Sequence, residues 1–322
     1  MSSTALRTRR ADKAPASGTA GRSGAGRGAT ATDRSRRLLA TLFLAPTMAG
    51  VFLFTLVPIV ASLLLAFFRW DIISAPQVVG VDNFVSIGSD PTVRIAFLNT
   101  IGFVIIAVAL QLGLALALAV LVQSKMPAWL RGFFRSAFFF PVILSASSVS
   151  IIMSYLFNQN FGLVNQVLGW VGIPAVPWLT SPAGAMTVII LVYVWQNFGF
   201  TFLILIGGLS SIPTDMYEAS SIDGATGFKQ FRNITLPLLS PTMLVASVMA
   251  IISALQIFDQ PYVITRGGPG DSTRTAVMVI FESAFKQLDF GRASAIGIVL
   301  TLLIMAITAL QFRLSRRFVH YN

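Results

Sequence analysis

The chain has 322 residues and a formal net charge of +11, with apolar residues at 55% and charged residues at only 11%. This balance excludes an ordinary soluble globular domain, and it predicts an integral membrane protein because the few charges are gathered between long uncharged stretches. The sequence has no cysteine, no phosphate-binding loop motif and no cluster of residues at metal-ligand spacing. We therefore expect no catalytic residues, no bound metal and no cofactor.

The N-terminal segment, residues 1–37, carries nine Lys and Arg side chains among glycine, alanine and serine. Such a composition cannot bury a core, so we expect a disordered basic tail. Nucleic-acid binding would need an ordered basic face with base-contacting residues, which this segment does not offer. The apolar run that follows begins too late and is too long for a signal peptide, so it is expected to remain as a membrane anchor.

The remaining residues, 38–322, form the predicted transmembrane domain. Five windows in it carry no charge: 38–68, 95–124, 136–214, 233–258 and 293–312. A helix needs about 20 apolar residues to cross the hydrocarbon layer, so four windows hold one span each, and the third, with its polar middle, holds two. We predict an all-α polytopic fold with six transmembrane helices, at about 40–66, 96–122, 136–157, 184–207, 241–259 and 293–312.

The distribution of Lys and Arg predicts the orientation of these spans. The N-terminal tail, the connector after the second span, the loop 209–240 and the C-terminus share the basic excess. On the opposite side, the basic residues are diluted by acidic ones. Because basic residues collect on the cytoplasmic side, both termini and the loop 209–240 are predicted to be cytoplasmic.

The cytoplasmic loop is polar and patterned, which a simple connector would not need. Pro213 suits the first turn of a helix, and Asp215 and Glu218 place negative charge near its positive end. Small and apolar side chains follow at helical spacing: Met216, Ala219 and Ile222. Gly224 then supplies a turn that ends this first helix.

A second short helix is expected after that turn. Phe228, Phe231 and Ile234 repeat the helical spacing, and Leu236 and Pro237 are expected to redirect the chain into the fifth span. Two short helices with apolar stripes form a surface on which another protein can dock. The alternative is an amphipathic loop that lies on the membrane surface without a partner.

The ionisable residues in the predicted spans indicate where the energy for transport comes from. Gradient-driven carriers bury ionisable residues in their spans, and the only acidic residue near a span is Asp259, at the end of the fifth. Without a phosphate-binding loop the chain does not hydrolyse ATP by the usual chemistry. We therefore expect the energy to come from a partner protein.

Polar side chains gather on one sector of the fourth span and one sector of the fifth. They are Tyr193, Gln196 and Asn197 on the fourth, and Ser253, Gln256 and Asp259, with Gln260 beside them, on the fifth. Proteins bind sugars through hydrogen bonds from polar side chains and through stacking on aromatic faces. These residues are therefore predicted to line a substrate pathway. The alternative is ordinary hydrogen bonding between helices.

The loop residues also occur in a recognisable order: Glu218-Ala219-Ser220, Asp223-Gly224-Ala225, Phe231, Ile234 and Leu236-Pro237. This order resembles the EAA loop of permease subunits in bacterial binding-protein-dependent ABC importers, with a serine where the family usually has its second alanine. The segment 258–269, FDQPYVITRGGP, is similar to the maltose-type sugar-importing branch, which Asn99-Thr100 also fits. The resemblance runs from about Leu38 to the C-terminus.

The resemblance implies a non-catalytic permease with the MetI-like fold of type I importers, in the bacterial cytoplasmic membrane. The partners that it implies are the lipid bilayer, a second homologous permease, two copies of a cytoplasmic ATPase subunit and an extracytoplasmic solute-binding protein that delivers the transported solute. That solute would be a carbohydrate or a related polyol or glycerol phosphate. The residues implied in ATPase coupling are Glu218, Ala219, Ser220, Asp223, Gly224, Phe231, Leu236 and Pro237.

Two functions of other classes stay open at this point. A gradient-driven secondary carrier would transport its solute without any partner. A membrane-embedded enzyme acting on lipid-linked sugars would need a cluster of charged residues at the membrane boundary, and only the region of Asp259 approaches that.

Overall fold

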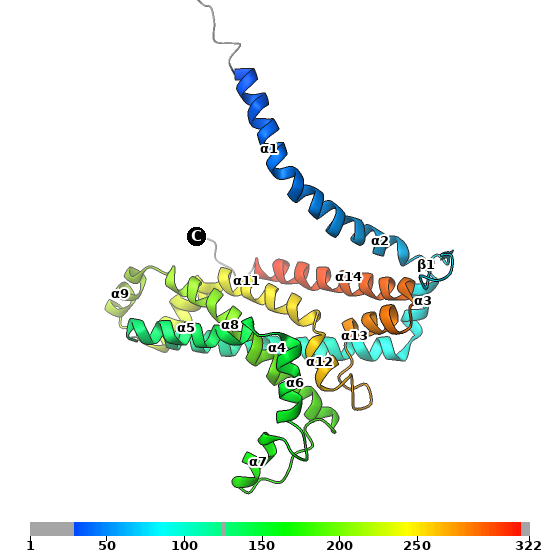
Figure 1. Cartoon of the computed structure of the whole chain (residues 1–322). Helices are drawn as coiled ribbons and strands as arrows, with labels where there is room; N and C mark the ends of the chain where they lie inside the picture. The colour runs from blue at the N-terminus through cyan, green and yellow to red at the C-terminus, as the bar shows by residue number, and fades with distance from the viewer. Residues whose placement is uncertain (1–28, 124–125, 317–322) are drawn as a thin grey trace, which may run out of the picture. The chain divides into compact units, whose positions relative to one another are not determined.

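The computed structural model describes residues 29–123 and 126–316, and these are almost entirely helical (Figure 1). The only strands in this part of the chain are β1 (Phe68–Arg69) and β2 (Gln77–Val78), which pair antiparallel. The prediction of an all-α fold is confirmed. Most of the predicted tail lies outside the described residues, and its last part, residues 29–37, belongs to helix α1 (Ala29–Val51).

The described residues divide into two units, the first of which includes residues 29–59 and the second the described residues from 60 to 316. In the first unit α1 continues through a π-helical turn, η1 (Phe52–Leu56), into α2 (Val57–Leu65), whose residues from Val60 onward belong to the second unit. The stretch Leu38–Leu65 is long and apolar enough to cross a membrane. The predicted first span falls on this stretch.

The second unit contains the other helices. In chain order they are α3 (Asp82–Ser89), α4 (Pro91–Gln123), α5 (Ala128–Ile143), α6 (Ala146–Leu156), α7 (Leu163–Trp170), α8 (Pro182–Ser210), α9 (Thr214–Ile222), α10 (Phe228–Gln230), η2 (Phe231–Thr235), α11 (Leu236–Leu255), α12 (Asp259–Ile264), α13 (Ala276–Phe281), η3 (Glu282–Lys286) and α14 (Phe290–Ser315). Helices α4, α8 and α11 pack against one another, and α14 packs against α11. Figure 1 shows α9 at one end of this bundle and α3 with the hairpin at the opposite end.

The core lies between α4, α8 and α11. One cluster of buried side chains includes Phe103, Ile189 and Leu255, and a second includes Phe202 and Leu239. Helix α5 approaches α8 closely, because a Cβ atom on Gly199 would lie 1.9 Å from the carbonyl oxygen of Phe138. Small residues allow helices to pack backbone to backbone in this way.

The third predicted span is not one straight helix. Helices α5 and α6 meet at an angle of 94°, so the single helix expected at 136–157 is wrong in shape. Leu144 has extended backbone angles between the two helices, and the Ser145 side chain accepts a hydrogen bond from the backbone N–H of Ser148 at the start of α6. A serine N-cap of this kind starts a new helix. The described residues thus hold five helices able to span a membrane, or six with this bent pair.

The entry into the fifth span also differs from the prediction. Leu236 and Pro237 do not redirect the chain, because α10, η2 and α11 follow one another as one helical run. The π-helical turn η2 ends at Thr235, two residues before Pro237, and η1 likewise ends at Leu56, two residues before Pro58 in α2. A proline lacks a donor and clashes with the carbonyl one turn back, and a widened turn relieves this. The helix α11 then ends at Leu255, and Asp259 begins α12, which still belongs to the apolar stretch Phe228–Ile264 that is long enough to cross a membrane.

Candidate functional site

The six residues predicted to line a pathway surround one cavity of about 240 Å³. It lies where α8, the end of α11, the start of α12 and the bend between α5 and α6 meet. The lining residues are Tyr193, Gln196, Asn197, Ser253, Gln256, Asp259, Val142, Leu144, Ala146, Ile257, Phe258 and Gln260. We call this space the inner cavity.

Tyr193 anchors one side of the inner cavity. Its ring is buried and meets Phe103 of α4 edge to face, with ring centroids 5.1 Å apart. Its hydroxyl donates a hydrogen bond of 3.2 Å to Oγ of Ser253 on α11. Asn197 bonds within its own helix, through Nδ2 to the Tyr193 carbonyl at 2.9 Å. The tyrosine therefore joins three helices at the cavity wall.

Two buried glutamines form a hydrogen-bonded chain beside it. Gln196 donates from Nε2 to the Leu144 carbonyl at 3.0 Å, and Gln260 donates from Nε2 to Oε1 of Gln196 at 3.0 Å. This chain links α12, α8 and the bend between α5 and α6. The alternative of interhelical hydrogen bonding is thus realised for Gln196 and for Tyr193 with Ser253, whereas Gln256 keeps an exposed side chain.

Asp259 is the one charged side chain among the residues that line the inner cavity. Its Oδ1 accepts a hydrogen bond of 2.6 Å from the hydroxyl of Ser147, so the first residue of α12 is fastened to α6. Ser147 was not predicted as a site residue. The sequence carries a signal for it in the run of serines from Ser145 to Ser150, at the point where the apolar window is interrupted.

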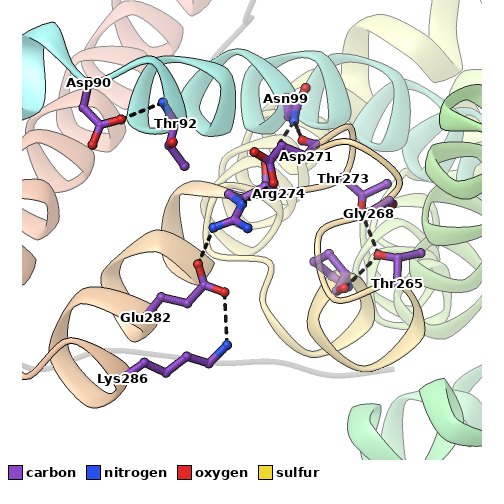
Figure 2. Close-up of polar contacts among 11 residues, drawn as sticks. Asp90, Thr92, Asn99, Thr265, Gly268, Asp271, Thr273, Arg274, Glu282 and Lys286 are labelled. Carbon is purple, nitrogen blue, oxygen red and sulfur yellow. Dashed lines mark hydrogen bonds and ion pairs between the residues drawn. The ribbon is translucent and has the colours of Figure 1, made fainter.

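The segment after α12 is fastened to α4 (Figure 2). Asn99 donates from Nδ2 to the carbonyls of Asp271 and Arg274, at 2.7 and 3.1 Å. The buried hydroxyl of Thr100 accepts from the backbone N–H of Ala276 at 3.0 Å. The Asn-Thr pair that carried part of the family resemblance therefore holds the start of α13 and the turn before it.

The predicted coupling loop ends its first helix at the predicted glycine. Gly224 has φ +76°, and its N–H donates to the Ser221 carbonyl at 3.1 Å while that of Ala225 donates to the Ser220 carbonyl at 2.9 Å. This pair of bonds is the Schellman arrangement, in which a glycine adopts the left-handed conformation just after a helix. The predicted turn at Gly224 is confirmed.

Two residues that the sequence reading missed tie the loop together. Gln230 donates from Nε2 to the Tyr217 carbonyl and to the hydroxyls of Ser220 and Ser221, at 3.2, 3.0 and 2.9 Å. The Tyr217 hydroxyl lies 3.0 Å from Oγ1 of Thr235. Residues 217, 220 and 221 share one helical face, which is the pattern that could have revealed this inner side.

The opposite face of α9 is open. Glu218, Ala219, Asp223 and Gly224 are exposed. Ile222 on the same helix exposes 88% of its surface, and Phe228 at the start of α10 exposes 73%. The other predicted coupling residues are only partly exposed: Ser220, Phe231, Leu236 and Pro237. The residues predicted to couple the permease to an ATPase therefore fall into two groups, an exposed group on and just after α9 and a partly buried group that packs inside the loop and at the start of α11.

Comparison with known proteins identifies the family. Residues 111–320 match the family described as binding-protein-dependent transport system inner membrane component. The chain is 35% identical to the sulfoquinovosyl glycerol transport system permease protein SmoG of Agrobacterium fabrum (88% of this chain, 92% of SmoG), and 31% identical to the trehalose/maltose permease protein MalF of Thermococcus litoralis (86% and 94%). A chain of the bacterial alginate ABC transporter, solved in complex with an alginate pentasaccharide-bound periplasmic protein, shares the fold with a TM-score of 0.79 and 22% identity over 89% of this chain and 97% of that one.

These matches confirm the resemblance to importer permeases and the type I importer fold. The relatives are permease subunits, so the chain is a non-catalytic, multi-pass component of a cell membrane. It belongs to the family of binding-protein-dependent transport system inner membrane components.

Proposed function

We propose that this permease forms half of the translocation pathway of an ATP-driven sugar importer and is coupled to its ATPase through α9. The observation that carries the proposal is the inner cavity, which collects all six predicted polar pathway residues from α8, from the end of α11 and from the start of α12. Its hydroxyl, amide and carboxylate groups match the hydrogen-bonding needs of a polyhydroxylated solute. The sugar-transporting relatives support a carbohydrate, or a related polyol or glycerol phosphate, as the cargo.

The inner cavity is open to one side, since Ser253 and Gln256 are exposed in the single chain. A second, homologous permease that covers this side would complete an enclosed pathway. Alternating access then requires the two subunits to move against each other. Asp259, Gln196 and Gln260 fasten α12 to its neighbours, so α12 would move together with the bend between α5 and α6.

The exposed face of α9 supports the coupling role. Glu218, Ala219 and Asp223 are free to meet a cytoplasmic ATPase, and the exposed apolar side chains of Ile222 and Phe228 would be covered by it. The hydrogen bonds of Gln230 make the loop a compact body that can transmit force to α11. An extracytoplasmic solute-binding protein would deliver the cargo to the opposite end.

The experiment that tests the function is reconstitution in lipid vesicles. The complete transporter, with the second permease and two ATPase subunits, is expected to take up labelled sugar only with ATP and the loaded binding protein. The purified permease alone is expected to transport nothing, with or without an ion gradient. Gradient-driven uptake by the permease alone would refute the proposal in favour of a secondary carrier.

A further inference from the structure

A second cavity, of about 570 Å³, also borders α12 and was not predicted from the sequence. Its walls come from α6, from α12 with the turn that follows, and from η3. The lining residues are Ile151, Ser154, Tyr155, Tyr262, Val263, Arg266, Glu282 and Lys286. We call this space the outer cavity, and its volume is in the range of small-molecule sites.

Two stacked rings separate the cavities. Phe258 lines the inner cavity and Tyr262 lines the outer one, and their rings stack with centroids 4.9 Å apart and planes at 19°. Phe281 packs against both rings, at 5.0 and 5.2 Å. The two spaces therefore share one short helix, α12, as their common wall.

The charges in the outer cavity are arranged around one carboxylate (Figure 2). Glu282 forms ion pairs with Arg274 at 2.5 Å and with Lys286 at 3.2 Å, so its charge is compensated within the wall. Lys286 also lies over the Tyr262 ring, 5.4 Å from its centroid. These contacts hold the wall in place without a ligand.

Two groups remain available to a ligand. Tyr155 exposes 63% of its surface on α6, and its ring contacts Phe161 at a centroid distance of 6.3 Å. Arg266 is exposed, is joined to no other described side chain by a hydrogen bond or ion pair, and has φ +53°, a strained angle for a residue other than glycine. An aromatic face with a guanidinium beside it provides stacking and several directed donors.

We infer that the outer cavity is a second carbohydrate site, which holds a sugar ring on Tyr155 and Arg266 before the ring passes the Phe258–Tyr262 stack. The inference rests on the proposed function. It differs from that function in assigning a resting position outside the inner cavity, on residues that the inner cavity does not use. The competing occupant of the same space is a loop of the solute-binding protein, and the test separates the two.

The test uses the complete transporter in vesicles with its binding protein. The probes are ¹⁴C-labelled glucose, maltose, trehalose and lactose, first assayed for uptake by the unmodified transporter. Uptake of none of them overturns the inference, whereas the proposed function still admits a polyol or a glycerol phosphate as the cargo. For each sugar that is taken up, the photoreactive p-benzoylphenylalanine replaces Tyr155 in one sample and Trp170 in the control. Trp170 is an aromatic residue on α7 with 79% exposure that lies outside both cavities.

The expected result is sugar-dependent labelling of the permease from position 155 and not from position 170. Crosslinking of position 155 to the binding protein instead of the sugar, equal labelling from both positions, or no labelling by a transported sugar would overturn the inference. In parallel, Tyr155→Ala should lower uptake about two- to tenfold, Tyr155→Trp should restore it, and the binding-protein concentration that half-stimulates the ATPase should stay unchanged. A rise in that concentration would assign the cavity to protein docking.

Discussion

Replacement of Gly224 by valine would test the coupling role of α9 most directly. Gly224 has φ +76°, and a Cβ atom built on it meets no atom within 4 Å, so the substitution adds backbone strain and no clash. A residue with a side chain pays about 1–2 kcal/mol for the left-handed conformation, most of all when it is β-branched. That energy corresponds to a factor of about 5–30 in the ratio of the closed turn to an opened one.

The turn is closed by the backbone bonds of Gly224 and Ala225 to the last turn of α9, so these bonds should be the ones lost. Sugar uptake and the amount of ATPase that copurifies with the permease are both expected to fall in Gly224→Val. The amount of permease in the membrane should stay unchanged, because the strained residue is exposed and remote from the core.

The matched control is Gly224→Asn, since asparagine tolerates the left-handed conformation. We expect the asparagine variant to keep most of the uptake and ATPase attachment. Normal attachment and transport in the valine variant would refute the reasoning. So would an asparagine variant as impaired as the valine variant, because the backbone angle would then not be what matters.

Three further predictions concern the membrane domain. Gly199→Ala should destabilise the purified protein by about 1–3 kcal/mol, because the new Cβ would collide with the backbone of α5. The control is Gly207→Ala in the same helix, whose Cβ would meet no atom within 4 Å and which should leave the melting temperature unchanged. Equal melting temperatures of the two variants would contradict this prediction. Thr100→Val leaves the buried N–H of Ala276 without its acceptor, and an unpaired buried donor costs about 1–3 kcal/mol. Hydrogen exchange at the start of α13 should therefore become faster, and an unchanged exchange rate would contradict the prediction. Gln256→Ala should reduce sugar uptake without a change in melting temperature, since the side chain is exposed; full uptake would remove it from the pathway.

Features with local causes could be predicted from the sequence. The turn at Gly224 follows from glycine's access to positive φ, and the polar sectors of α8 and α11 follow from helical periodicity. The stripe of Met216, Ala219 and Ile222 on α9 was predicted from the same periodicity, and all three residues are exposed. The inner face of α9 was not predicted, because the side chain that binds residues 217, 220 and 221 is Gln230 of the next helix, and the spacing within α9 does not identify that partner.

The bend between α5 and α6 shows where the sequence reading fails. Hydropathy measures the length of an apolar run and carries no information about its direction. The signals were present in Pro141 and Ser145, yet prolines and serines also occur in straight spans. The opposite error arose at Pro237, where a π-helical turn absorbed the proline and the helix continued. Whether a helix breaks or widens depends on its packing partners.

The same bend releases a backbone carbonyl, that of Leu144, which accepts the hydrogen bond from Gln196 at the edge of the inner cavity. Every amino acid would present an identical oxygen at that position, so substitutions of Leu144 cannot remove it. Variation among transporters of different specificity would then have to act through its side-chain partner, Gln196. Because the Leu144 carbonyl is fixed and the side chain at position 196 is replaceable, substitution at position 196 can change the polar groups at the cavity while the bend between α5 and α6 is kept.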